Sequence, residues 1–204
     1  MHSENKTTDI ELAIGICGHR WVRESSELLS AIDKVVEKIE QDYSFQSLKL
    51  ISPLAEGADR VVAKRMLLSS NAALVALLPF PVEDYLVDFS TPVSVREFRD
   101  LFVQANQIIE LPGHLTREEA YVALGKTLLD QSDVLIAVWD GKPANGRGGT
   151  AEIVQEVRER GMPLAWIHHT QPGKMETVVT PDADQMRLIF ERFPSQNTVS
   201  GAES

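Results

Sequence analysis

The amino-acid sequence predicts a Rossmann-like α/β fold: a single domain with a doubly wound, mainly parallel sheet and helices on both faces. Short, continuous apolar runs alternate along the chain with segments whose apolar residues recur at helical spacing. Continuous apolar runs are typical of parallel strands, which are buried on both faces. A chain of 204 residues is long enough for one sizeable core, and no linker divides it. We therefore expect one domain over residues 11–194, with disordered ends at 1–10 and 195–204.

The first half of the chain has the order β-α-β-α-β, which is the rhythm of a parallel sheet with covering helices. Ser25 or Ser26 can cap the first helix, and Pro79 ends the third strand. The expected elements are a strand at 12–17, a helix to Ile39, a strand at 48–52, a helix around 61–67 and a strand at 73–78.

The second half continues this alternation after a less regular stretch at 82–91. Pro92 stands where a helix can begin, and Thr116 and Glu119 have the spacing of a capping box. The expected elements are a helix from Pro92, a short strand at 107–111, a helix from Thr116, strands at 134–139 and 163–167 separated by a helix at 151–160, and an edge element at 186–193.

Composition and charge exclude several classes of function. The net charge of −10 disfavours nonspecific attraction to nucleic acid or an anionic membrane, so any bound phosphate must be held by a local site. The longest strongly apolar stretch, 72–81, is half the ~20 residues that a membrane span needs. Cys17 is the single cysteine and is expected in the core, and His168-His169 lacks further metal ligands. We expect a soluble, cytoplasmic protein with no metal site.

Three unusual segments fall where predicted strands end: Gly18-His19-Arg20, Glu56-Gly57-Ala58-Asp59-Arg60 and Gly146-Arg147-Gly148-Gly149-Thr150-Ala151-Glu152. In an open parallel sheet, ligands bind outside the carboxyl ends of the strands, where the strand order reverses. If the first strand is central and the 134–139 strand flanks it, the first and third segments face each other. We expect the three segments to form one site.

Two features of this predicted site suit an anion such as phosphate. Gly148 and Gly149 allow a ligand to approach backbone N–H groups, and Thr150 adds a hydroxyl at a helix start, where the dipole favours anions. Arg20 and Arg60 follow strand ends, where a guanidinium can bind phosphate through two hydrogen bonds. The alternatives are a glycine loop that only joins a strand to a helix, and arginines that pair with acidic neighbours or are solvated.

Other polar residues of the same turns are candidates for the rest of the ligand. Glu56 and Asp59 could bind ribose hydroxyls, although acidic residues at helix starts also serve as caps. His19 is a candidate contact, with backbone hydrogen bonding as its alternative role, and Asp140 directly follows a strand. The predicted ligand-binding set is Gly18, His19, Arg20, Glu56, Gly57, Ala58, Asp59, Arg60, Asp140, Gly148, Gly149 and Thr150.

In this order and at these intervals, the three segments resemble the SLOG superfamily, which includes the lonely-guy phosphoribohydrolases, the DNA-processing protein A family and the nucleotide-sensing domain of TRPM channels. The resemblance covers about 12–168 and implies a nucleotide, nucleoside or ADP-ribose-like ligand, with no further cofactor. In the lonely-guy enzymes, a glutamate three residues after the threonine assists N-glycosidic cleavage. Here Glu152 comes two residues after Thr150, and this difference of one position turns the side chain by about 100° around a helix.

Three functions follow as hypotheses. The first is a nucleotide-sensing module that reports to a signalling partner protein. The second is an N-glycosidase or phosphoribohydrolase acting on nucleoside monophosphates, with Glu152 as catalytic acid or base. The third is a structural or assembly protein with a vestigial crevice. Lonely-guy-type relatives pair through helices, and the apolar Val95, Phe98, Leu101 and Phe102 exceed what a surface helix normally carries, so we also expect a homodimer.

Overall fold

The computed structural model describes residues 10–70, 72–112, 116–143, 148–170 and 186–194. Within these ranges the chain alternates strands and helices, as the sequence predicts. The elements are β1 (Glu11–Gly18), α1 (Ser26–Asp42), β2 (Ser47–Ser52), α2 (Ala58–Ser69), β3 (Ala73–Leu78), α3 (Val82–Leu86), α4 (Pro92–Phe102), β4 (Gln107–Glu110), α5 (Arg117–Asp130), β5 (Val134–Trp139), α6 (Thr150–Arg160), β6 (Leu164–His168) and β7 (Arg187–Glu191).

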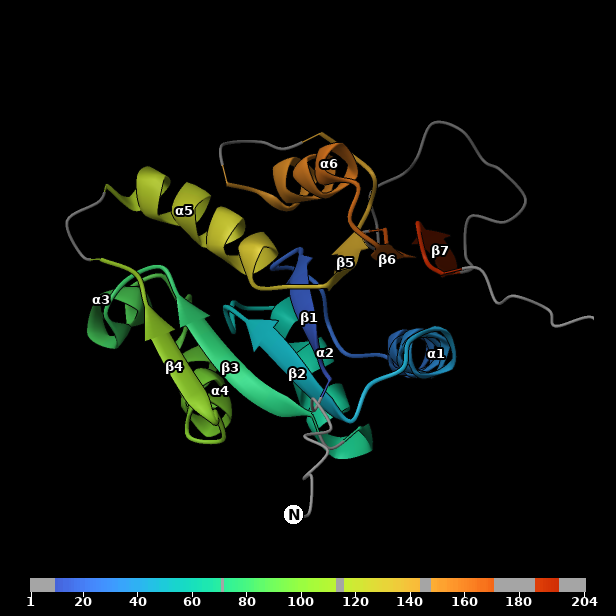
Figure 1. The fold of residues 1–204 in the computed structure, drawn as a ribbon. Helices are drawn as coiled ribbons and strands as arrows, with labels where there is room; N and C mark the ends of the chain where they lie inside the picture. Colours follow the sequence, from blue (N-terminus) through green and yellow to red (C-terminus); the bar gives the residue numbers. More distant parts are fainter. Residues whose placement is uncertain (1–9, 71, 113–115, 144–147, 171–185, 195–204) are drawn as a thin grey trace, which may run out of the picture.

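The described strands form one sheet in the order β4-β3-β2-β1-β5-β6-β7 (Figure 1). All neighbouring pairs are parallel except the last, in which β7 runs antiparallel to β6 at the edge. The strand order reverses at β1, because the chain first builds outward through β2, β3 and β4 and then returns to place β5 on the other side. This confirms the Rossmann-like, doubly wound fold, with β1 and β5 adjacent as expected.

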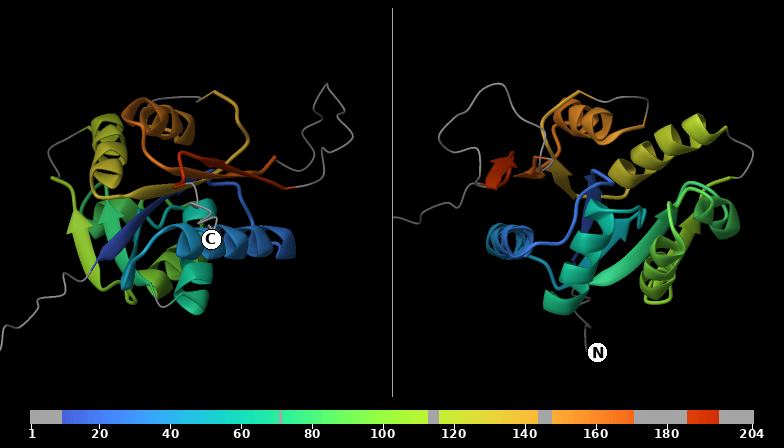
Figure 2. Two further views of the ribbon diagram at one scale, coloured as in Figure 1. Left: turned by 45° about the vertical axis from the view of Figure 1, so that its right-hand side comes forward. Right: turned by 180° about the vertical axis from the view of Figure 1, so that it is seen from behind.

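Helices cover both faces of the sheet, and each face has its own core (Figures 1 and 2). One core joins alternate strand residues such as Ile14 and Leu50 to α1, α2 and α4. The other joins Ile51 and Leu135 to α5 and α6. Because successive strand residues point to opposite faces, a strand between two cores must be apolar at nearly every position. This explains why β5 is buried at all six of its positions.

The helix starts are largely those that the sequence predicts. Ser25 accepts a hydrogen bond from the Leu28 N–H at the start of α1, and Thr116 and Glu119 form a complete capping box at α5. The difference is α3, a short helix in the stretch predicted to be irregular. It forms because Pro81 precedes it and the buried Tyr85 anchors it against the core.

Residues 1–9 and 195–204 lie outside the described residues, so the disorder predicted for the two ends stays a prediction. Ile10, the first described residue, is exposed. Within the described ranges, no helix has the length and apolar character needed to cross a bilayer.

The apolar face of α4 packs inside the chain. Phe98 is fully buried and Leu101 nearly so, and Phe98 contacts the rings of Tyr85, Phe89 and Phe102 at centroid distances of 5.8, 5.1 and 5.2 Å. The expected homodimer rested on these side chains. It stays a prediction, but their burial within one chain accounts for the apolar pattern of α4 without a partner.

Phe98→Ala is expected to destabilise the fold by about 3–5 kcal/mol, because it removes a fully buried ring and leaves a cavity. Urea unfolding measures the loss. Val103→Ala, one turn beyond and 79% exposed, is the matched control and should change stability by less than about 0.5 kcal/mol. Equal effects of the two substitutions would contradict the assigned packing of α4.

Candidate functional site

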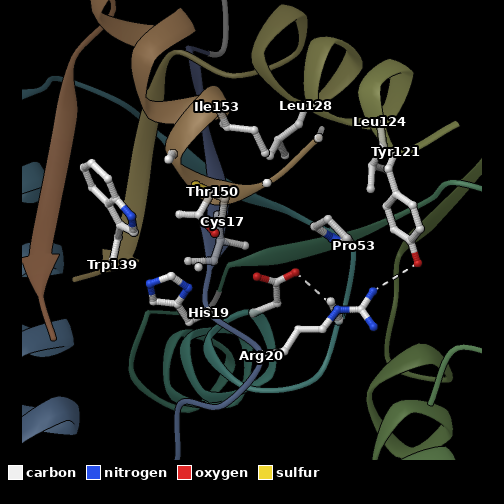
Figure 3. A pocket seen from close by; sticks show the side chains of 18 of the residues that line it. Cys17, His19, Arg20, Pro53, Tyr121, Leu124, Leu128, Trp139, Thr150 and Ile153 are labelled. Atoms are coloured by element: carbon white, nitrogen blue, oxygen red, sulfur yellow. Dashed lines mark hydrogen bonds between the residues drawn. The ribbon is translucent and has the colours of Figure 1, made fainter. Parts of the chain in front are cut away.

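A cavity of about 810 Å³ lies at the carboxyl ends of β1 and β5, where the strand order reverses (Figure 3). This is the position at which open parallel sheets bind ligands. Its walls come from the turn after β1, the loop after β2, the turn after β5, α5 and the start of α6. Eight of the residues predicted for the ligand site line it: Gly18, His19, Arg20, Asp59, Asp140, Gly148, Gly149 and Thr150.

His19 joins the turns after β1 and β5. Its Nε2 lies 2.9 Å from Asp140 Oδ1, and its ring stacks on Trp21 at a centroid distance of 5.0 Å. Asp140 also accepts a hydrogen bond from the Lys142 N–H. Burial opposes ionisation of Asp140, but these hydrogen bonds outweigh it and lower its pKa. One side of the cavity therefore carries the ionised Asp140 carboxylate, with the His19 imidazole held against it.

Arg20 stands on the opposite side from His19 (Figure 3). Its Nη2 donates to the Tyr121 hydroxyl at 3.0 Å, and Tyr121 in turn donates to Asp88. Asp88 also pairs with Arg117 at 2.9 Å. Arg117 neutralises the charge of the Asp88 carboxylate. The hydrogen bonds from Arg20 to Tyr121 and from Tyr121 to Asp88 therefore orient the Arg20 guanidinium, and its remaining exposed N–H groups can bind an anion.

The turn before α6 lies directly over α5. Gly148 has φ +74°, and a Cβ atom there would lie 3.1 Å from the Tyr121 backbone, so the close approach of loop and helix requires glycine. Gly149 is the N-cap of α6 and has no side chain to bind the amides of the first turn. Thr150 begins the helix and lies at the centre of the cavity in Figure 3. These features provide the helix-start amides that favour an anion.

Apolar side chains form the remaining wall. Leu124 and Leu128 of α5 and Ile153 of α6 line one side, and Trp139 lies above His19 (Figure 3). Cys17 forms part of the floor, where burial raises the pKa of its thiol well above the ordinary value. A cavity with one apolar wall and a few convergent polar groups is typical of a small-molecule site.

Asp59 is the most perturbed carboxyl of the cavity. It is only 4% exposed, and its Oδ2 accepts a hydrogen bond from the Ala55 N–H at 3.3 Å. Burial raises its pKa to about 7, although the Ala55 hydrogen bond and the charges of Arg20 and Arg60 oppose the increase. Asp59 is therefore a carboxyl that can change its charge near neutral pH inside a candidate ligand site.

Five predicted site residues do not line the cavity: Glu56, Gly57, Ala58, Arg60 and Glu152. Glu56 accepts hydrogen bonds from the backbone and hydroxyl of Ser90. The carboxylate of Glu152 turns back to the Gly148 N–H at 2.6 Å. Glu152, which stands one position nearer to Thr150 than the glutamate of the lonely-guy enzymes, therefore makes a capping hydrogen bond at the start of α6 and does not line the cavity.

Gly57 and Ala58 join the turns after β1 and β2. The Ala58 N–H donates to the His19 carbonyl at 3.1 Å. Gly57 has φ +83°, and a Cβ atom there would lie 2.4 Å from the same carbonyl oxygen. Their role is therefore to hold the His19-Arg20 turn in place, which no other residue at 57 could do without displacing the backbone.

Arg60 is buried among protein groups. It is 3% exposed, its Nε donates to the Leu54 carbonyl at 2.9 Å, and its Nη1 donates to Ser94. Leu54 is held at φ +54°, a conformation that is costly for a residue with a side chain. These contacts give Arg60 a structural role, in which it fixes the loop between β2 and α2; that it also holds a phosphate stays a prediction.

Tyr85 of α3 and the wall formed by α5 were not predicted as parts of the site. The sequence predicts a helix from Thr116, but not that Tyr121, Leu124 and Leu128 of this helix line a cavity. Helical spacing shows which residues share a face, but it does not show that this face extends past the end of β1. A signal was present in Tyr121, because a tyrosine in an otherwise aliphatic stripe needs a partner for its hydroxyl.

Among the described residues, no group of three or more His, Cys, Asp or Glu side chains is arranged to hold a metal ion. A scan against protein-family models finds no match, and a search of curated proteins finds no matching protein. One similar solved structure is that of Moco Carrier Protein from Chlamydomonas reinhardtii, with a TM-score of 0.42 and 17% sequence identity. The alignment covers 79% of this chain and 78% of the carrier protein chain. At this level of similarity, the name of that protein does not bear on the ligand of this one.

Asp59→Asn is expected to remove a pH dependence from the stability of the protein. The pKa of Asp59 is about 7 when folded and near 3.8 in a free side chain, so the folded state binds its proton more tightly. The contribution of Asp59 to stability is therefore most favourable below about pH 4, is lost as the pH rises towards about 7, and stays lost above it. The free energy of unfolding of the variant, relative to that of the parent, should therefore increase by on the order of 2–4 kcal/mol as the pH rises from about 4 to about 8. Urea unfolding across this range measures it, and a constant difference would show that burial does not perturb Asp59.

Proposed function

We propose that this protein binds a nucleotide or a nucleotide derivative such as an ADP-ribose-like molecule in the cavity between β1 and β5. The cavity volume of about 810 Å³ lies within the ~300–1,000 Å³ typical of ligand sites. The apolar wall of α5 and α6 suits the face of a base, and the polar groups on the other walls suit sugar and phosphate.

One observation carries this proposal. Arg20 and the amino end of α6, which are about 130 residues apart in the sequence, line the same cavity although the chain has a net charge of −10. A guanidinium and a helix start are two independent devices for holding an anion. Their convergence favours a phosphate-bearing ligand over an apolar one.

We further propose that the protein is a SLOG-type sensing module, in which the bound ligand is reported to a partner protein. The support is the order of the three sequence segments and the fact that each of them contributes to one cavity: Gly18, His19 and Arg20 from the first, Asp59 from the second, and Gly148, Gly149 and Thr150 from the third. The capping position of Glu152 also favours binding over cleavage by the glutamate of the lonely-guy enzymes.

Arg20→Ala is expected to weaken nucleotide binding roughly 10- to 150-fold, the range for losing a hydrogen bond to a charged group. Gly149→Val should abolish it, because a branched side chain would occupy the approach to the α6 amides. The φ of −85° at Gly149 tolerates valine without backbone strain. Calorimetric titration with nucleoside mono- and diphosphates and ADP-ribose measures both effects.

Arg96→Ala is the matched control, since Arg96 is exposed on α4, does not line the cavity and changes the net charge by the same amount. It should bind like the parent protein. Unchanged binding in both Arg20→Ala and Gly149→Val would place the site elsewhere.

We propose N-glycosidic hydrolysis of a nucleoside monophosphate as the second candidate function, with Asp59 in place of Glu152 as its acid or base. The observation that favours it is the pKa of about 7 at a carboxyl inside the cavity, since general acid–base catalysis works best near the operating pH. Asp59 would take a proton from water as the water oxygen bonds to C1′ of the ribose and the bond from C1′ to the base breaks; the proton then passes from Asp59 to the leaving base, giving free base and ribose phosphate.

Chromatography for a released base tests the second candidate. Asp59→Asn is expected to lower turnover on the order of 100-fold or more, whereas Glu152→Gln should retain it. If Glu152→Gln loses turnover and Asp59→Asn does not, Glu152 is the acid or base after all. If the parent protein binds nucleotides but releases no base from any of them, the protein is a binding module.

A further inference from the structure

Tyr85 of α3 is a cavity residue with an unusual hydroxyl. Its side chain is fully buried, it lines the cavity, and its Oη has no hydrogen-bond partner among the described residues. Buried polar groups in folded proteins nearly always have a partner, and of the unpartnered side chains among the described residues only Tyr85 belongs to the cavity lining, where a ligand could supply the partner.

The packing of the ring does not explain the hydroxyl. The ring contacts Phe89 and Phe98 at centroid distances of 5.0 and 5.8 Å, and a phenylalanine would make the same contacts. The hydroxyl end faces charged and polar groups of three other segments: Arg20 after β1, Asp59 and Arg60 of α2, and Tyr121 of α5. Three of these four, all except Arg60, line the cavity with Tyr85. The hydroxyl therefore lies among polar groups that line the cavity, although its oxygen is covered in the unliganded protein.

Asp59 supplies the complementary group. It lines the same cavity, and its carboxyl accepts hydrogen bonds from the backbone N–H groups of Ala55 and of Asp59 itself, which leaves accepting capacity on the two oxygens. A phosphate would be repelled by the ionised carboxylate. A ligand hydroxyl can donate to Asp59 and accept from Tyr85 at once.

We propose that Tyr85 Oη and the Asp59 carboxyl form a subsite that binds a hydroxyl group of the ligand's ribose. The proposal rests on the nucleotide-binding function and adds the sugar that the site selects. Arg20 and the start of α6 hold the phosphate, while Tyr85 and Asp59 distinguish a ribonucleotide from its deoxy form.

The test is calorimetric titration of the parent protein and Tyr85→Phe with ribonucleoside monophosphates and diphosphates and ADP-ribose, each beside its 2′-deoxy and 3′-deoxy counterpart. The parent protein should bind the ribo form about 5- to 100-fold more tightly than one of the two deoxy forms. Tyr85→Phe should bind both at the affinity that the parent has for that deoxy form, because the hydroxyl contact is gone.

Tyr43→Phe is the matched control. Tyr43 also has a buried hydroxyl without a partner among the described residues, but it is the C-cap of α1 and does not line the cavity. Its loss should leave ribose discrimination unchanged.

The outcomes separate this proposal from the one on which it rests. If no nucleotide binds the parent protein, the nucleotide-binding function is wrong. If nucleotides bind but the parent does not distinguish ribo from deoxy forms, only the subsite is wrong. The same holds if Tyr85→Phe keeps the discrimination. The comparison of ribo and deoxy forms on the parent protein needs no variant, so it stands even if a substitution disturbs folding.

Discussion

The contact of the β1 turn with the β2–α2 turn is the constraint on which the candidate site depends. The His19 carbonyl accepts the Ala58 N–H, and Gly57 lets the two backbones meet at a distance that no Cβ atom would allow. This contact fixes the direction in which His19 and Arg20 leave β1. Arg20 then extends to Tyr121, while the pairing of β1 with β5 brings His19 to Asp140.

The buried polar residues around this contact fall into two groups with different roles. Arg60 donates to Ser94 through Nη1 and to the Leu54 carbonyl through Nε, and these bonds maintain the shape of the loop behind the cavity. Asp59 and Tyr85 face the cavity and keep hydrogen-bonding capacity for a ligand. The division explains why two adjacent charged residues of α2, Asp59 and Arg60, serve the site in different ways. In the proposed function Asp59 contacts the ligand, whereas Arg60 holds the loop in place.

The sheet could be predicted from the sequence, because parallel strands that are buried on both faces are continuous runs of apolar residues, as in β5. The sequence also predicted that the turns after β1 and β5 meet, since the switch point of such a sheet brings them together. It could not separate Arg20 from Arg60, because both follow strand ends and only tertiary packing shows which guanidinium is covered. Tyr85 was beyond prediction for the same reason: α3 is a single short helix turn whose place beside Asp59 depends on the docking of α4. Glu152 was a prediction carried by resemblance, and its hydrogen bond to Gly148 places it outside the cavity.

The most direct test of this account is a crystal structure of the protein soaked with a mixture of ribonucleotides. The account predicts one nucleotide in the cavity between β1 and β5, with its phosphate within hydrogen-bond distance of Arg20 and the first amides of α6. The ribose should lie beside Tyr85 and Asp59, and the base should lie along Leu124, Leu128 and Ile153. A nucleotide bound outside this cavity, or one whose phosphate contacts neither Arg20 nor α6, would contradict the account.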